Sequence, residues 1–275
     1  MTFRPDEHGL LAVPGASLYW ESTGTGPPLV LVHAGIADHT MWDDDVPTLA
    51  ARHRVVTYDC RGYGRSASTD VAFSNRADIT ALLDHLGLDR AAVLGCSRGG
   101  QIALDFALEQ PARVSALVLV AAGLGGFDHD PTPEELALFD SEEPMWLAKD
   151  WAGVSDLDVR LWVDGVGQPA DRVPASIRER VRAMSRANYE AEYPGGQPIV
   201  LDPPAAGRLG EVKVPTLIVH GDLDVSAIDA AAEALERGVV WARRVTLPGV
   251  AHMVNLERPV EFRGLVLDFL AEVGA

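Results

Sequence analysis

The chain has 275 residues, 47% of them hydrophobic, which suits one large domain or one domain with a subdomain. Its net charge of −17 disfavours nucleic acid and anionic membranes as partners, since both require basic patches. The sequence has neither a run of about 18 apolar residues nor an apolar leader in "MTFRPDEHGL", so we expect a cytoplasmic protein without a membrane span.

Short β-branched runs alternate with helical stretches along the chain, a pattern typical of βαβ units and a mostly parallel sheet. Several of these runs are continuously apolar, as expected of strands that are covered on both faces. Strands are predicted over residues 17–22, 28–35, 54–60, 91–97, 115–123, 215–222 and 242–249.

Helices are predicted between these strands. Residues 78–87 carry apolar side chains at helical spacing and stop at Gly87. A second helix follows the strand at 91–97 and stops before Pro111. The segment 258–274 is predicted to hold the C-terminal helix, with a proline in its first turn.

The alternation of strands and helices stops between residues 124 and 212, where no convincing strand appears. Helical patterns occur there at 133–150, 155–164 and 174–190, separated by proline and glycine. We interpret 124–212 as a helical cap inserted before the seventh strand, between the core segments 1–123 and 213–275. Its aromatic side chains either pack a small core of their own or line a pocket beneath a lid, because binding sites often lie at subdomain interfaces.

The segment "GCSRG" fits the pattern G-x-S-x-G with Ser97 at its centre. A nucleophile on a tight strand-to-helix turn has a strained backbone that neighbouring chain must approach closely, and flanking glycines permit this. The helix that follows directs its backbone N–H groups toward the site, where they can stabilise an oxyanion. Cys96 should point the opposite way from Ser97, so we interpret Cys96, like Cys60, as a buried free thiol.

A serine nucleophile needs a base and an acid that orients the base. Of the eight histidines, His252 stands out because it lies in a loop after the last strand, at the sheet edge where ligands bind. For the acid, "VHGDLDV" offers Asp224, which we prefer, and Asp222, while Asp128 is a third candidate. Gly35, followed by Ile36, is the expected second oxyanion donor.

These motifs together resemble the α/β-hydrolase superfamily. The matching segments are "HAG" (33–35), "DCRGYGRS" (59–66), "GCSRGG" (95–100), "HGDLD" (220–224) and "GVAHMVNLERP" (249–259). The resemblance implies an α/β fold with an eight-stranded sheet, flanking helices and a helical cap. It also implies nucleophile Ser97, acid Asp224, base His252, and oxyanion amides from Gly35 and Arg98. Ala34 departs from the glycine that the family often has there; its methyl group narrows the loop but should not remove the amide.

The segment "DCRGYGRS" lacks the phosphate-binding P-loop pattern. In the family this segment is structural, and we expect Asp59 and Arg61 to form a satisfied ion pair near a loop.

The expected function is a carboxylic-ester hydrolase that cleaves an ester or lactone through an acyl-enzyme on Ser97. The serine argues against haloalkane dehalogenases and epoxide hydrolases, which use aspartate. The stretch from residue 33 to 66 resembles the enol-lactonase-like branch. A C–C bond hydrolase, a perhydrolase and a weakly hydrolytic ligand receptor remain alternatives. The sequence indicates no metal and no cofactor, a small-molecule substrate, and a monomer or homodimer.

The side chain of Arg98 has two possible roles. It pairs with a nearby carboxylate, because an unpaired buried charge is costly, or it reaches the pocket and holds a carboxylate of the substrate. The remaining candidates for contact with substrate are Ile36, Trp146, Trp151, Trp162 and Met253.

Overall fold

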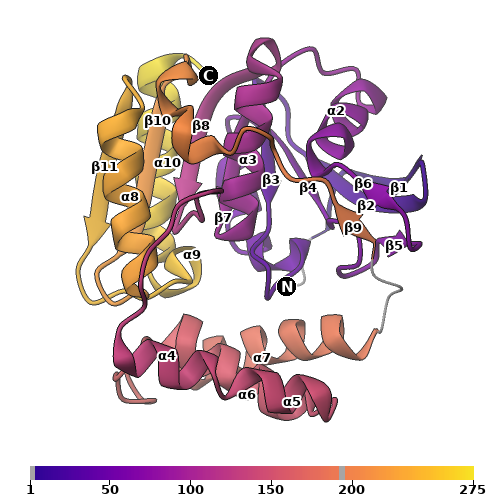
Figure 1. Cartoon of the computed structure of the whole chain (residues 1–275). Coiled ribbons are helices and arrows are strands. Elements are labelled where there is room, and N and C mark those ends of the chain that lie inside the picture. Colours follow the sequence, from indigo (N-terminus) through magenta and orange to yellow (C-terminus); the bar gives the residue numbers. More distant parts are fainter. Residues whose placement is uncertain (1–3, 192–195) are drawn as a thin grey trace.

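A mixed sheet runs through the molecule, which we describe from a computed structural model covering residues 4–191 and 196–275 (Figure 1). Its strands lie in the order β1-β2-β4-β3-β7-β8-β10-β11, and the short β5 pairs with β2. β2 runs antiparallel to its neighbours, whereas the strands from β4 to β11 are parallel, so the predicted mostly parallel α/β sheet is confirmed. The strands are β1 (Glu7–Val13), β2 (Ala16–Thr23), β3 (Pro28–Val32), β4 (Arg54–Tyr58), β5 (Ala67–Ser68), β7 (Ala91–Cys96), β8 (Val114–Val120), β10 (Thr216–Gly221) and β11 (Ala242–Leu247).

Helices cover both faces of this sheet, and the two faces bury separate clusters of side chains. Because side chains alternate along a strand, Leu29 and Leu31 of β3 enter the cluster beneath α1 and α10, while Val30 and Val32 enter the cluster beneath α2, α3 and α8. The helices are α1 (Val46–Leu49), α2 (Asn75–His85), α3 (Arg98–Glu109), α4 (Pro133–Phe139), α5 (Glu142–Leu147), α6 (Trp151–Asp158), α7 (Ala175–Glu190), α8 (Ser226–Gly238), α9 (Val254–Glu257) and α10 (Pro259–Val273).

Strand β1 was not expected from the sequence. It is an edge strand that pairs only with β2 among the described elements, and most of its side chains are exposed or half-buried. A half-exposed edge strand does not need the continuous apolar run by which the central strands are recognised.

The helices α4 to α7 gather at one end of the sheet, between β8 and β10 in the chain (Figure 1). A π-helical turn, Val159–Asp164, continues α6. The segment also holds the two-residue strand β9 (Gln197–Pro198), which pairs with β6 (Ala72–Phe73) and was not predicted. We call residues 124–212 the helical insertion, and 192–195 within it lie outside the described residues. No helix in the described ranges is long and apolar enough to cross a membrane.

Candidate active site

Ser97 occupies a strained turn between β7 and α3. Its φ of 56° and ψ of −120° are unusual for a residue with a side chain, and its N–H donates to the carbonyl of Val120 at 2.8 Å. A Cβ at Gly95 would lie 2.1 Å from the carbonyl oxygen of Gly99, and one at Gly99 would lie 2.3 Å from that of Val32. Glycine is therefore required on both sides of Ser97, because the backbone passes too closely for any side chain.

His252 and Asp224 meet at the same end of the sheet. His252 lies in the loop between β11 and α9, and its Nδ1 is 2.8 Å and 3.0 Å from the two carboxylate oxygens of Asp224. Both side chains are almost completely buried, which shields the pair from water. The Asp224 carboxylate also accepts the N–H of Val225 at 2.8 Å, so its orientation is fixed by the backbone.

The two alternative acids lie elsewhere. Asp222 accepts the N–H of Gly249 at 2.6 Å, and this contact ties the loop after β10 to the loop that carries His252. Asp128 is exposed to solvent. Of the three candidate carboxylates, Asp224 is the one that contacts the imidazole.

Ser97 and His252 line one cavity of about 270 Å³, which we call the serine cavity. Gly35 and Ile36, from the loop after β3, lie in its wall, while the π-helical turn contributes Trp162. The Trp162 ring lies 4.7 Å from the His252 ring, between centroids. The Ser97 side chain does not cap α3, so its hydroxyl is left for the cavity that it lines.

The sequence did not point to Asp158, which also lines the serine cavity. Its carboxylate accepts hydrogen bonds from Ser185 at 2.5 Å and from Tyr189 at 2.8 Å. Burial raises the pKa of Asp158, and the hydrogen bonds from Ser185 and Tyr189 act in the opposite direction. Its position in the helical pattern "VSDLDVRLW", where apolar and polar residues alternate irregularly, does not distinguish it from a surface carboxylate.

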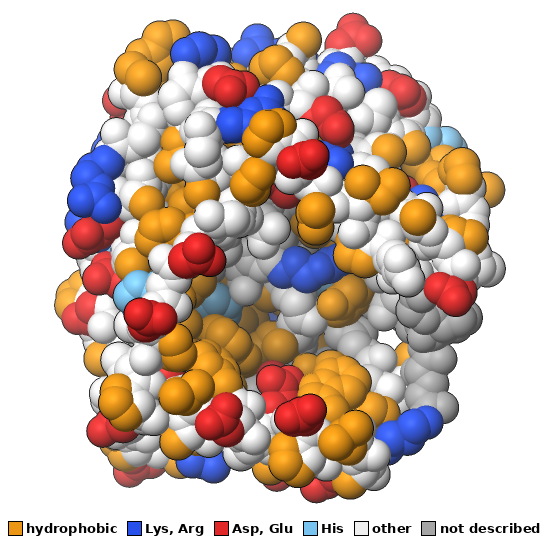
Figure 2. All heavy atoms as spheres, viewed as in Figure 1, with side chains coloured by type: hydrophobic (Ala, Val, Ile, Leu, Met, Phe, Trp, Pro, Cys, Tyr) orange, Lys and Arg blue, Asp and Glu red, His pale blue; other side chains and the backbone are white. Residues whose placement is uncertain are grey.

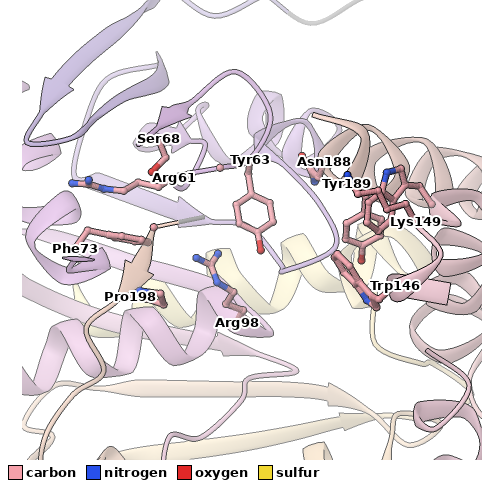
Figure 3. A pocket seen from close by; sticks show the side chains of 13 residues that line it. Arg61, Tyr63, Ser68, Phe73, Arg98, Trp146, Lys149, Asn188, Tyr189 and Pro198 are labelled. Carbon is pink, nitrogen blue, oxygen red and sulfur yellow. The ribbon is translucent and has the colours of Figure 1, made fainter. Parts of the chain in front are cut away.

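A larger cavity of about 660 Å³ lies beside the first, and Tyr189 lines both (Figure 3). We call it the arginine cavity because Arg98 enters its wall from α3. Two predicted contact residues, Trp146 and Trp151, line it and form an edge-to-face pair with ring centroids 5.0 Å apart. The space-filling view shows the hollow between the helical insertion and the sheet, with a basic side chain in its wall (Figure 2).

The remaining predicted contact residue, Met253, is fully buried in the core cluster beneath α1 and α10. Cys96 is also fully buried in that cluster, and desolvation raises the pKa of its thiol well above the usual value. A buried thiol with this pKa is a poor nucleophile, in agreement with its interpretation as a packing residue.

No carboxylate of the described residues lies within ion-pair distance of Arg98, although pairing was one of its two expected roles. Its Nη2 has only a long contact of 3.5 Å to the amide oxygen of Asn75, and its Nη1 is buried without a hydrogen-bond partner there. The guanidinium lies over the Tyr63 ring at 4.8 Å. Burial lowers the pKa of Arg98, but neighbouring Tyr63 and Cys60 raise it more, so the group stays charged.

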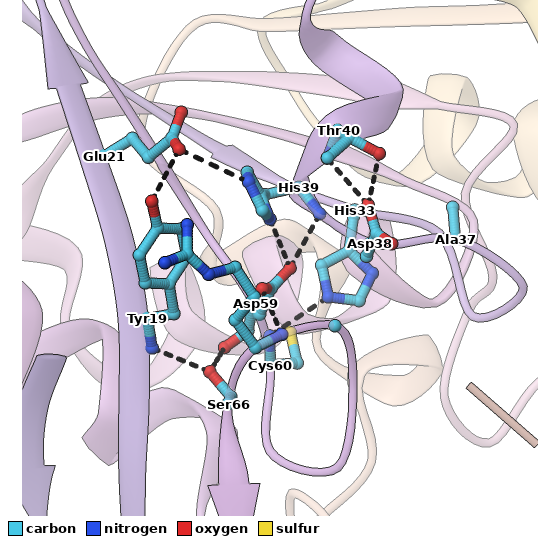
Figure 4. Close-up of polar contacts among 12 residues, drawn as sticks. Tyr19, Glu21, His33, Ala37, Asp38, His39, Thr40, Asp59, Cys60 and Ser66 are labelled. Carbon is cyan, nitrogen blue, oxygen red and sulfur yellow. Dashed lines mark hydrogen bonds and ion pairs between the residues drawn. The ribbon is translucent and has the colours of Figure 1, made fainter. Parts of the chain in front are cut away.

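Asp59 and Arg61 are both engaged, but not with each other. Arg61 forms two hydrogen bonds of 2.7 Å to the carboxylate of Asp78, with both side chains buried. Asp59 instead accepts two hydrogen bonds from His39, one from the backbone N–H and one from the ring Nδ1, each at 2.8 Å (Figure 4). The expected ion pair between Asp59 and Arg61 is therefore wrong, because each has an oppositely charged partner from another segment.

The Asp59–His39 contact positions the loop that carries Gly35, since it ties that loop to the end of β4. On its other side, His39 Nε2 lies 3.5 Å from Glu21, which also accepts a hydrogen bond from Tyr19 at 2.7 Å. Burial lowers the pKa of His39, but its contacts with Asp59 and Glu21 outweigh burial and raise the pKa to about 10. Asp38, His39 and Asp59 lie close enough to hold a cation, but His39 is already their internal cation.

Comparison with known proteins agrees with the fold. A family model described as the alpha/beta hydrolase fold matches residues 27–259. A pimeloyl-(acyl-carrier protein) methyl ester esterase of Nitrosomonas europaea is 31% identical, over 90% of this chain and 97% of the relative. A 2-hydroxy-6-oxononadienedioate/2-hydroxy-6-oxononatrienedioate hydrolase of Pseudomonas putida is 33% identical, over 82% and 79% of the two chains. The solved structure of an N-acyl homoserine lactone degrading enzyme superposes with a TM-score of 0.75 at 26% identity, covering 95% of this chain and all of the other (100%).

Proposed function

The chain belongs to the alpha/beta hydrolase family, and we propose that within it the protein is a serine hydrolase of carboxylic esters or lactones. The observation that carries the proposal is the His252–Asp224 pair, held by two short contacts, in a cavity that Ser97 also lines. The strained backbone at Ser97 supports it further, because such strain is typical of a nucleophile at a strand-to-helix turn.

In the proposed mechanism, Nδ1–H of His252 donates to Asp224, which leaves Nε2 as the base. The Ser97 hydroxyl attacks the substrate carbonyl as His252 takes its proton, and the backbone N–H groups of Gly35 and Arg98 stabilise the oxyanion. The C–O bond then breaks, and His252 returns the proton to the leaving alkoxide. A water molecule, activated by the same imidazole, attacks the acyl-enzyme and releases the acid and free Ser97.

The helical insertion is proposed to act as a cap that selects substrates. It contributes Trp162, Tyr189 and Asp158 to the wall of the serine cavity, so a change in its side chains alters the space around Ser97. The N. europaea relative favours an ester as substrate and the solved lactone-degrading enzyme favours a lactone. The P. putida relative keeps C–C bond hydrolysis as a second candidate on the same three residues.

The test is a panel of chromogenic esters and small lactones assayed with wild-type protein, Ser97→Ala and Cys96→Ala. Ser97→Ala should lower kcat by about 10⁴-fold or more, because the nucleophile is lost. Cys96→Ala is the matched control, since it removes the adjacent, buried potential nucleophile and should keep most of the activity. A fluorophosphonate probe should label wild-type protein once, at Ser97. Full activity in Ser97→Ala would refute the proposal, and turnover of a vinylogous diketone but of no ester would favour the C–C hydrolase.

A further inference from the structure

The two arginines in the wall of the arginine cavity differ in how their charges are balanced. Arg61 is neutralised by two hydrogen bonds of 2.7 Å to Asp78. Arg98 has no carboxylate within 4 Å among the residues that the structure describes; its neighbours are the Tyr63 ring and the Cys60 thiol, and its Nη1 is buried without a hydrogen-bond partner there. A buried guanidinium normally has its donors satisfied, so the orphaned Nη1 indicates a missing acceptor.

The position of Arg98 connects this charge to the candidate nucleophile. Arg98 follows Ser97 directly, and the two Cα atoms are therefore only about 3.8 Å apart. The Arg98 stem passes Gly35, where an added Cβ would lie 3.6 Å from both Cβ and Cδ of the arginine. Beyond that point the guanidinium enters the arginine cavity (Figure 3). Tyr189 lines both this cavity and the serine cavity. A substrate that contacts both Ser97 and the guanidinium must therefore extend from one cavity into the other past Tyr189.

We propose that Arg98 is a specificity-determining residue that binds a carboxylate of the substrate, so that the preferred ester or lactone carries a free acid group. The inference rests on the proposed hydrolase function and deepens it. The unpaired Nη1 and the weakly engaged Nη2 together form a planar fork that matches the two oxygens of a carboxylate. A dianionic phosphate fits less well, because Asp78 already neutralises the second arginine of the wall.

The test uses two substrates of similar size: the nitrophenyl monoester of glutaric acid and a neutral ester in which an isopropyl group replaces the carboxylate. The readout is the ratio of kcat/KM for the acidic ester to that for the neutral one. Arg98→Met keeps most of the apolar stem and should lower this ratio about 10- to 100-fold, mainly through KM of the acidic ester, since charged hydrogen bonds are lost. Arg98→Lys should give a ratio between those of the wild type and Arg98→Met, because lysine keeps the charge but lacks the planar fork of two N–H donors.

Lys149→Met is the matched control, because Lys149 lines the same cavity from the helical insertion. It should change the ratio less than Arg98→Met does. An equal fall of the ratio in Arg98→Met and Lys149→Met would show that the positive charge of the whole cavity attracts the acidic ester, and would overturn the assignment to Arg98. An unchanged ratio in Arg98→Met would overturn it as well, and would leave a structural role.

A binding measurement separates this inference from the proposed function. Glutarate is titrated calorimetrically into Ser97→Ala and into Ser97→Ala/Arg98→Met, so that turnover plays no part. Binding should weaken about 10- to 100-fold in the double variant. Equal binding in the two proteins overturns the inference even when esters are hydrolysed. If glutarate binding depends on Arg98 but the wild-type protein hydrolyses no ester or lactone, the proposed function is overturned and the inference about Arg98 is not.

Discussion

The buried His39 cation gives a quantitative prediction for the dependence of stability on pH. Its pKa is 6.5 in an unfolded chain and about 10 in the folded protein. Because the folded pKa is the higher one, the contribution of His39 is fully present below pH 6.5 and is lost as pH rises through 10. The loss is at most about 1.4 kcal/mol per pH unit, or about 3–4 kcal/mol between pH 7 and pH 10, because the slope decreases as pH approaches the folded pKa.

The perturbation is His39→Gln, which removes the charge and leaves Asp59 and Glu21 without this partner. At pH 7 the variant should unfold more easily than the wild type by about 4 kcal/mol, since two buried carboxylates lose their cation. At pH 10 the gap should fall to about 1 kcal/mol or less, because the wild-type ring is by then losing its proton. Urea unfolding, followed by tryptophan fluorescence at both pH values, measures the two gaps.

A constant gap would refute the reasoning. If wild type and His39→Gln differed by the same free energy of unfolding at pH 7 and pH 10, the ring would be neutral and would act through packing alone. The comparison cancels the titration of groups common to both proteins, so other ionisable residues do not imitate the effect.

Two further predictions concern stability. Gly99→Ala should reduce the free energy of unfolding by about 1–3 kcal/mol and lower activity, because its Cβ would meet a carbonyl of β3. Gly264→Ala lies in open space within α10 and should raise the free energy of unfolding by about 0.5–1 kcal/mol. An equal effect of the two substitutions in urea unfolding would contradict the close packing at the turn. Asp78→Asn should reduce the free energy of unfolding by about 3–5 kcal/mol, because it leaves the charge of Arg61 buried and unpaired. Asp84→Asn removes an exposed ion pair and should reduce the free energy of unfolding by under about 1 kcal/mol. Similar thermal denaturation midpoints for the two variants would argue against a buried ion pair.

The sequence indicated the parts of the fold that are buried on both faces. Strands such as β7 and β10 are apolar throughout, so their character is visible without knowledge of their neighbours. The residues Ser97, Asp224 and His252 follow strands, and parallel strands bring their carboxyl ends to one edge. The contact of Asp224 with His252 could therefore be anticipated, although their distances could not.

Partners from distant segments could not be anticipated in the same way. Asp59 pairs with His39, and Arg61 pairs with Asp78 instead of its near neighbour, because the loop after β4 turns the two side chains toward different elements. The surroundings of Arg98 also depend on loops that no local pattern positions. Asp158 faces the serine cavity only because the helical insertion folds over the sheet edge, and periodicity within the insertion does not specify that docking.

The helical insertion leaves the sheet after β8 and returns to it at β10, and these two strands are direct neighbours. Leu117 pairs with Thr216 although 98 residues separate them in the chain, so the helical insertion begins and ends at neighbouring strands. Its length and sequence can therefore diverge without shifting the register of the large sheet or the turn at Ser97. In evolutionary and engineering terms we propose that the insertion is an exchangeable module, in which new substrate preferences can arise while the proposed reaction chemistry is inherited unchanged.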